Sequence, residues 1–206
     1  MFALALSSLA LTAVSYALPM LTTRQSDPCA GLGIASFPTE YNFTLAAWNW
    51  TLPNANDTGA PLVIGQAGAV DGESFGVLST WATYSYADWT TFSLIDGALI
   101  PYSADGAASN GVDANIFSGE ELLWVFTVNP PPPAEIYCGV ADPDPAGGYQ
   151  YAALAVNGST DGFSLCLLGE PPYVQNNIVY RASPNNTDGY DYESCYGVRV
   201  QILPLS

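Results

Sequence analysis

The segment Thr91–Tyr102 (TFSLIDGALIPY) consists of two apolar runs on either side of an Asp-Gly pair. This arrangement predicts a β-hairpin with a type I′ turn at Asp96-Gly97, because that turn needs φ > 0 at both central residues. Pairing across the turn places Leu94 opposite Leu99. Both faces of the hairpin carry apolar side chains, so we expect it to lie inside a larger sheet that the rest of the chain supplies.

Other segments rich in β-branched and aromatic residues recur along the chain, and turns rich in Gly, Pro, Asn and Asp separate them. None has a convincing helical pattern, so we predict an all-β chain of about eleven or twelve short strands. The prolines at 130–133 predict an extended spacer between two strands. Besides the hairpin's second strand, the expected strands are Tyr41–Trp50, Leu62–Gln66, Ser74–Thr83, Thr90–Ile95, Glu121–Val128, Ile136–Ala141, Tyr151–Val156, Phe163–Leu168, Asn177–Arg181 and Tyr196–Leu203.

Strands with this turn spacing indicate a β-sandwich or a closed barrel. An F-[ST]-L pattern occurs three times, beginning at Phe43, Phe92 and Phe163, and favours a β-trefoil-like barrel, with a β-sandwich as the alternative. We expect residues 29–206 to form a single compact all-β domain, since this length suffices for one hydrophobic core.

Residues 1–17 (MFALALSSLALTAVSYA) predict a secretory signal peptide, because they are apolar and end in a small-x-small cleavage site. Residues 18–28 are expected to be a flexible leader. Five N-x-[ST] sequons agree with secretion, and their glycans would hydrate a chain that is 49% hydrophobic and only 11% charged. The sequon asparagines are Asn42, Asn49, Asn56, Asn157 and Asn185.

Asn42 and Asn49 are separated by an odd number of residues, so a regular strand cannot expose both. We expect either a break in the strand near Ala46-Ala47 or one unused sequon.

The formal net charge is −16, from 19 acidic residues against three arginines, with neither lysine nor histidine. This charge excludes nucleic acid and an anionic membrane surface as expected partners. We expect a monomer that has no membrane association after signal removal, needs no cofactor, and has a surface kept soluble by its acidity.

The cysteines are Cys29, Cys138, Cys166 and Cys195. An even number in a secreted chain predicts two disulfides, for which three pairings exist. We favour Cys166–Cys195, which joins two nearby strands, and Cys29–Cys138, which ties the mature N-terminus to the core. A zinc site is not expected, because the chain has no histidine and no C-x-x-C spacing.

The order of motifs over roughly Phe92–Pro204 is FSLIDGALIPYS, LLWVFTVNPPPPAEIY, YAALAVNG, DGFSLCLLGEPPYVQNNIVY and SCYGVRVQIL. This order resembles secreted fungal cell-wall proteins of the PhiA type and, more distantly, the C-terminal module of the yeast wall mannoproteins with internal repeats. The resemblance implies a non-catalytic, glycosylated, extracellular or wall-associated protein. It does not extend to covalent attachment to glucan, because the Gln-bearing repeats are absent, nor to a disulfide pairing, because the cysteine spacings differ.

Catalysis by histidine or lysine is excluded by composition, which leaves hydrolysis by paired carboxylates as the remote enzymatic alternative. Most of the acids lie in turns, where acidic residues are ordinary turn formers. Asn186, Asp188, Asp191 and Glu193 form a possible calcium-binding segment, but they do not match an EF-hand loop, and we favour a solvated acidic loop. The candidate acids are Asp71, Glu73, Glu120, Glu121, Asp142, Asp144, Asp191 and Glu193.

The segment WATYSYADW brings Trp81, Tyr84, Tyr86 and Trp89 close together, with Tyr84 and Tyr86 on the same face of any strand. Such rings pack into a core or stack on sugars. We favour core packing and keep a lectin-like carbohydrate-binding face as the alternative, which predicts loss of glycan retention on Trp81→Ala or Trp89→Ala. The main hypothesis is a secreted, non-catalytic wall or matrix protein with cell-wall polysaccharide as a possible partner.

Overall fold

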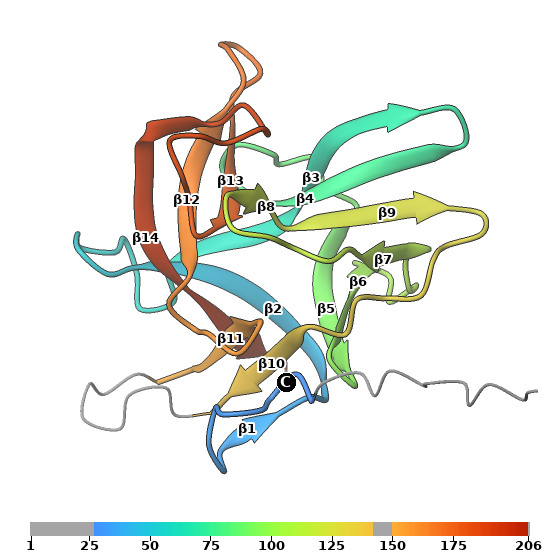
Figure 1. Cartoon of the computed structure of the whole chain (residues 1–206), viewed down its shortest axis with the longest axis vertical. Helices are drawn as coiled ribbons and strands as arrows, with labels where there is room; N and C mark the ends of the chain where they lie inside the picture. Colours follow the sequence, from blue (N-terminus) through green and yellow to red (C-terminus); the bar gives the residue numbers. More distant parts are fainter. Residues whose placement is uncertain (1–26, 142–149, 206) are drawn as a thin grey trace, which may run out of the picture.

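The computed structural model describes residues 27–141 and 150–205, and these ranges contain fourteen β-strands and no helix (Figure 1). The all-β prediction is therefore confirmed. The predicted signal peptide, most of the predicted leader and the candidate acids Asp142 and Asp144 lie outside the described residues. Within the described ranges, the chain has no helix with the length and hydrophobicity that crossing a membrane requires.

The Asp-Gly hairpin forms as predicted between β5 (Trp89–Ile95) and β6 (Ala98–Ser103). Asp96 and Gly97 have φ values of 51° and 90°, and Leu94 pairs with Leu99. Gly97 of the turn is buried, whereas Asp96 is exposed, and Tyr137 at the start of β10 donates its backbone N–H to the Gly97 carbonyl oxygen at 2.9 Å. The Asp-Gly turn, which the local sequence predicts, therefore also contacts a strand about 40 residues later in the chain.

All fourteen strands belong to one antiparallel sheet, in which every expected strand is present. The main path runs β1-β10-β11-β14-β12-β13-β4-β3-β2-β5-β6, and β7, β8 and β9 pair beside it. Three short strands, β1, β7 and β8, were not predicted. The bounds of the remaining strands are β1 Ser36–Phe37, β2 Glu40–Asn49, β3 Ala60–Val70, β4 Glu73–Thr80, β7 Gly111–Asp113, β8 Glu120–Glu121, β9 Leu123–Thr127, β10 Tyr137–Val140, β11 Ala152–Val156, β12 Phe163–Leu168, β13 Gln175–Tyr180 and β14 Asp191–Pro204.

The longest strand, β14, connects two parts of the sheet. Its first half pairs with β12, and its second half, Val198–Pro204, pairs with β2 along seven residues and with β11 at Gln201 and Ile202. β4 likewise pairs with β3 along its length, with β9 through residues 73–77 and with β13 at Ser79. This course is compatible with a sandwich-like sheet, the alternative expected from the sequence.

The three F-[ST]-L segments do not form the equivalent repeats that a β-trefoil needs. Phe43 in β2 pairs directly with Phe92 in β5, and their rings stack with centroids 6.4 Å apart. Phe163 lies in β12, which pairs with β13 and β14 instead. The pattern recurs because Phe and Leu two positions apart share a buried strand face, which happens in any β-sheet core.

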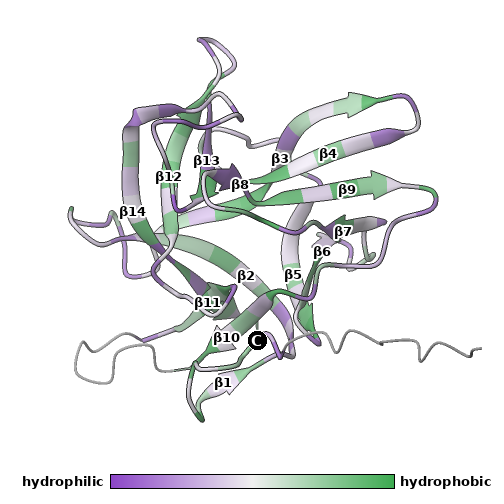
Figure 2. Ribbon diagram, in the orientation of Figure 1, coloured by the Kyte–Doolittle hydropathy of each residue, from purple (hydrophilic) through white to green (hydrophobic). Residues whose placement is uncertain are grey.

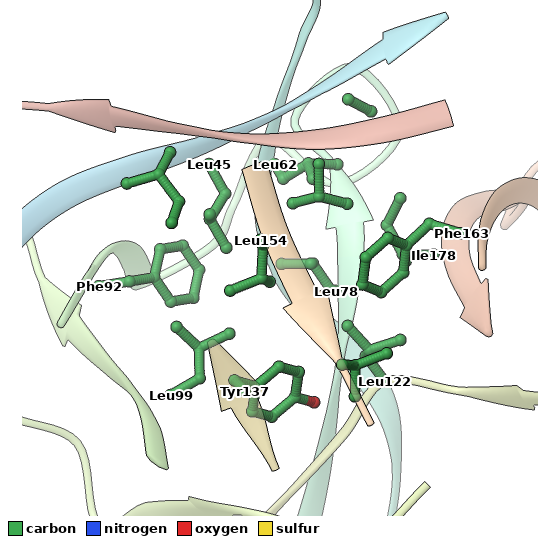
Figure 3. Close-up of a cluster of buried hydrophobic side chains, with 14 of the residues drawn as sticks. Leu45, Leu62, Leu78, Phe92, Leu99, Leu122, Tyr137, Leu154, Phe163 and Ile178 are labelled. Atoms are coloured by element: carbon green, nitrogen blue, oxygen red, sulfur yellow. The ribbon is translucent and has the colours of Figure 1, made fainter. Parts of the chain in front are cut away.

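The core lies where the strands face one another, and its large side chains come from strands throughout the sequence (Figure 3). Hydrophobic residues concentrate in the strands and hydrophilic ones in the connecting loops (Figure 2). Trp124 is fully buried, and its indole N–H donates to the Leu99 carbonyl oxygen at 2.8 Å. The side chains that point toward one another in Figure 3 include Leu45, Leu62, Leu78, Phe92, Leu99, Leu122, Tyr137, Leu154, Phe163 and Ile178.

The first expected strand is irregular at Asn42, not at Ala46-Ala47 as the sequence suggested. Asn42 has a φ of 56°, and the pairing of β2 with β5 shifts register between Glu40 and Phe43. Ala46 and Ala47 are both buried within the regular part of the strand. The local bulge lets Asn42 be exposed while Asn49 stays partly exposed at the strand's other end.

Two disulfides hold the N-terminal segment and the C-terminal strands in place. Cys29 is bonded to Cys138 in β10, and Cys166 in β12 is bonded to Cys195 in β14. This is the pairing favoured from the sequence, and no cysteine is free.

Candidate functional site

The aromatic segment between β4 and β5 is a loop, so the prediction of a strand through Thr83 is wrong. The strand ends at Thr80, and the Tyr84 N–H donates to the Thr80 carbonyl oxygen at 3.0 Å in a single turn. The Thr83 hydroxyl accepts the backbone N–H of Asn176 in the β13 strand at 2.9 Å. The loop is therefore tied to the sheet at its start.

Three of the four aromatic residues of this segment lie on one groove. Tyr84, Tyr86 and Trp89 line a groove of about 340 Å³ together with Phe126 of β9. Tyr86 is 89% exposed, whereas Trp89 is half-buried and stacks on Phe126, with ring centroids 6.1 Å apart and an interplanar angle of 21°. The core packing expected from the sequence therefore accounts for the position of the half-buried Trp89 ring, but it does not account for the position of the exposed Tyr86 ring.

Trp81 lies apart from the other three. Its ring is 43% exposed and lines a separate apolar pocket of about 270 Å³ with Pro61 and Leu203. The grouping of four aromatics expected from the sequence is therefore corrected to three, because the turn after Thr80 sends Trp81 to a different surface.

The groove continues beyond the Trp89–Phe126 stack into a second hollow of about 490 Å³. Ser74, Trp89 and Phe126 line both hollows, so the two are adjacent. The lining runs along β4 from Gly76 to the turn residue Gly72, a length of about 14 Å for an extended strand. We call these two adjacent hollows together the aromatic groove.

The position of Phe126 depends on two glycines. A Cβ at Gly76 would lie 2.8 Å from the Phe126 ring, and a Cβ at Gly111 would overlap the same ring. Because both positions lack a side chain, the Phe126 ring can occupy this space, where it stacks on Trp89. Phe126 was not among the candidate residues from the sequence, because it lies in an apolar run that is typical of a buried strand.

Two acidic residues lie on the aromatic groove, one in each hollow. Asp88 lines the hollow of Tyr84 and Tyr86, and Glu73 lines the hollow beyond the stack. Both are exposed, and neither side chain forms a hydrogen bond or ion pair with any residue in the described ranges. Their oxygen atoms are available to a ligand.

The candidate acids Glu120 and Glu121 meet Asp188 at a different pocket, of about 360 Å³. Burial raises the pKa of Glu121 to about 7, although a hydrogen bond from the Asn177 amide at 2.6 Å opposes the shift. An Asp188 carboxylate oxygen accepts the Glu121 backbone N–H at 2.9 Å. Asp71 and Glu73 lie instead at the β3–β4 turn, and Asp191 and Glu193 begin β14.

The surroundings of Glu121 form a continuous polar network. Asn177 is fully buried between Glu121 and the Ser79 hydroxyl, which donates to its side-chain oxygen. The Ser79 hydroxyl oxygen also lies 3.1 Å from the Gln175 side-chain oxygen, and the Gln175 amide donates to the Gln66 carbonyl oxygen at 2.8 Å. This network links β8, β13, β4 and β3, and its members satisfy one another, as a structural network inside a sheet requires.

A second buried carboxyl was not among the candidates from the sequence. Asp113 in β7 is 2% exposed, and its carboxylate accepts the backbone N–H groups of Leu99 at 3.2 Å and Ala134 at 3.3 Å. Burial raises its pKa to about 6. The nearby Tyr137 hydroxyl is buried without a hydrogen-bond partner in the described structure, and burial together with Asp113 raises its pKa well above the ordinary value.

The possible calcium segment forms a turn through its own side chains. Asn186 accepts the Gly189 N–H at 2.7 Å and donates to the Tyr190 carbonyl oxygen at 3.2 Å, while Asp191 accepts the Glu193 N–H at 3.0 Å. In the ranges that the structure covers, no three His, Cys, Asp or Glu residues are grouped so that they could hold a metal ion.

The sequon asparagines lie at the surface. Asn42, Asn56, Asn157 and Asn185 are exposed and Asn49 is partly exposed. The side-chain oxygens of Asn49 and Asn56 each accept the hydroxyl of the threonine two residues later at 3.1 Å. The Asn157 amide nitrogen, where a glycan would be attached, donates to the Ile116 carbonyl oxygen at 3.2 Å, and glycosylation of the five sites stays a prediction.

Comparisons of this chain with protein-family models, with curated proteins and with solved structures find no match.

Proposed function

We propose that this chain is a secreted, N-glycosylated, non-catalytic protein of a fungal-type cell wall or extracellular matrix, which acts as a monomer by binding wall polysaccharide at the aromatic groove. The two disulfides agree with an extracellular protein, since such bonds persist in oxidising compartments. The resemblance to secreted fungal wall proteins supports the wall association.

The observation that carries the binding role is the exposure of Tyr86 beside Trp89. An 89% exposed ring contributes little to the core, yet it lines the same groove as a fixed, half-buried Trp–Phe stack. Aromatic faces with a few hydrogen-bonding groups around them suit a ligand that is apolar on its ring faces and polar at its edges, as a sugar is.

The experiment is a pull-down of the mature, glycosylated protein on insoluble β-glucan, chitin and mannan, with competition by soluble sugar. Saturable binding that Tyr86→Ala weakens and Trp81→Ala leaves unchanged is expected, because only Tyr86 lies on the aromatic groove. Binding that neither substitution alters, or no binding to any polymer, would contradict the proposal.

The proposal that the protein is not an enzyme is tested separately. Reducing ends released from the bound polymer should stay at the level of a blank, and they should not depend on Glu121, the carboxyl with the raised pKa in the neighbouring pocket. Release that Glu121→Gln abolishes would instead make the protein a carboxylate hydrolase.

A further inference from the structure

We propose that the aromatic groove selects a polysaccharide with free amino groups, such as partly deacetylated chitin, over neutral glucans. This inference rests on the proposed carbohydrate-binding role and names the class of sugar. The two carboxylates on the groove, Asp88 and Glu73, lie on either side of the Trp89–Phe126 stack and have no partner within the described protein. A protonated sugar amine is the counter-charge that they lack.

Within the described residues, no arginine lines either hollow, so no cationic side chain there neutralises Asp88 or Glu73. The chain has no lysine, and the two arginines that the structure describes lie elsewhere. Arg181 lies over the Tyr180 ring at 5.0 Å, and Arg199 lies over the Trp50 ring at 4.7 Å. Neither arginine lines the groove, so an acidic polysaccharide would meet uncompensated negative charge there.

The aromatic rings favour the same ligand. The exposed Tyr86 ring and the Trp89–Phe126 stack offer faces that attract both the apolar face of a pyranose and a nearby ammonium group. A neutral sugar would gain only the first of these contacts.

The length of the groove favours a chain over a single sugar. The lining spans about 14 Å along β4, and its two carboxylates lie in different hollows. A polymer with several amines can engage both carboxylates at once, and the net charge of −16 attracts it over longer distances.

The test is a titration of the mature protein with soluble chitosan oligomers and with N-acetylated oligomers of the same length, at about pH 5, where carboxylates and sugar amines are both charged. We expect the chitosan oligomers to bind at least about fivefold more tightly. Asp88→Asn and Glu73→Gln should each weaken chitosan binding about two- to fivefold. Tyr86→Ala should weaken it about three- to tenfold without changing the net charge.

A matched control separates the groove from general attraction to an acidic protein. Glu193→Gln removes one exposed charge at the start of β14, which lies across the molecule from β9 (Figure 1), and it should leave binding unchanged. If Glu193→Gln weakens binding as much as Asp88→Asn does and Tyr86→Ala has no effect, attraction to the groove is refuted.

The remaining outcomes distinguish this inference from the proposed function. Equal binding of chitosan and N-acetylated oligomers, both weakened by Tyr86→Ala, would overturn the preference for amines and leave carbohydrate binding standing. Binding of neither oligomer, together with no retention on glucan, chitin or mannan, would overturn both.

Discussion

Raising the pH should destabilise this protein through Asp113, and Asp113→Asn should remove that part of the pH dependence. Burial raises the carboxyl's pKa in the folded protein from 3.8 to about 6. Since the folded state holds this proton more tightly than the unfolded chain, the stabilisation is fully present below about pH 3.8 and is lost as the pH rises through about 6. A difference of about two pKa units corresponds to about 3 kcal/mol.

Asp113→Asn also changes the free energy of unfolding through its hydrogen bonds, independently of the titration of Asp113. An asparagine keeps one side-chain oxygen but replaces the other with an NH₂ group, so it loses one of the acceptors that serve Leu99 and Ala134. We expect Asp113→Asn to lower the free energy of unfolding by about 1 kcal/mol near pH 4. Near pH 7 the variant should be the more stable protein, because it has no buried charge to form.

Urea unfolding with the disulfides intact, repeated from about pH 4 to about pH 7, measures this difference. Asp161→Asn, which removes an exposed carboxyl by the same chemical change, serves as the matched control. A constant difference between wild type and Asp113→Asn over the same range would refute the reasoning, since it would mean that the Asp113 carboxyl titrates alike in both states.

Three further predictions follow from buried or strained positions. Glu121→Gln should reduce the loss of stability between about pH 4.5 and 7 in the same urea experiment, because burial raises the pKa of Glu121 to about 7; an unchanged pH profile would contradict this. Replacing Cys29 and Cys138 by alanine should lower stability by about 5 kcal/mol, because the disulfide closes a loop of 109 residues; a thermal midpoint equal to the wild type's would argue against it. Gly97→Ala should destabilise by about 1–3 kcal/mol in thermal unfolding, because Gly97 has a φ of 90° and a Cβ there would lie 2.9 Å from the Glu135 carbonyl oxygen; a neutral effect would show that the turn relaxes.

The structure of the aromatic loop between β4 and β5 could not be predicted from its local sequence. The segment from Trp81 to Trp89 has the composition of a strand, yet the chain turns after Thr80 because its hydrogen-bonding partners lie on β13 and at Pro61. Alternation along a strand was therefore the wrong basis for grouping these rings. Phe126 was missed for a related reason, since its role depends on two glycines distant in sequence.

The short strands were missed on physical grounds as well. β7 and β8 have three and two residues, and their pairing partners are β9 and β13. A segment this short has no periodicity to detect. The buried carboxyl of Asp113 and the partly buried carboxyl of Glu121 lie in these two strands, so their raised pKa values could not be expected without the fold.

The amino-acid sequence alone determined the all-β class and the Asp-Gly hairpin with its register, and it favoured one of three disulfide pairings, which the structure has. These follow from short-range conformational demands, from β-strand composition and from a small number of cysteines. The tertiary structure alone decided the strand order, the burial of Asp113, the separation of Trp81 from the other aromatic residues of its segment and the position of Phe126 beside them. Those features depend on which distant segments lie side by side, and a residue's local neighbours do not specify that.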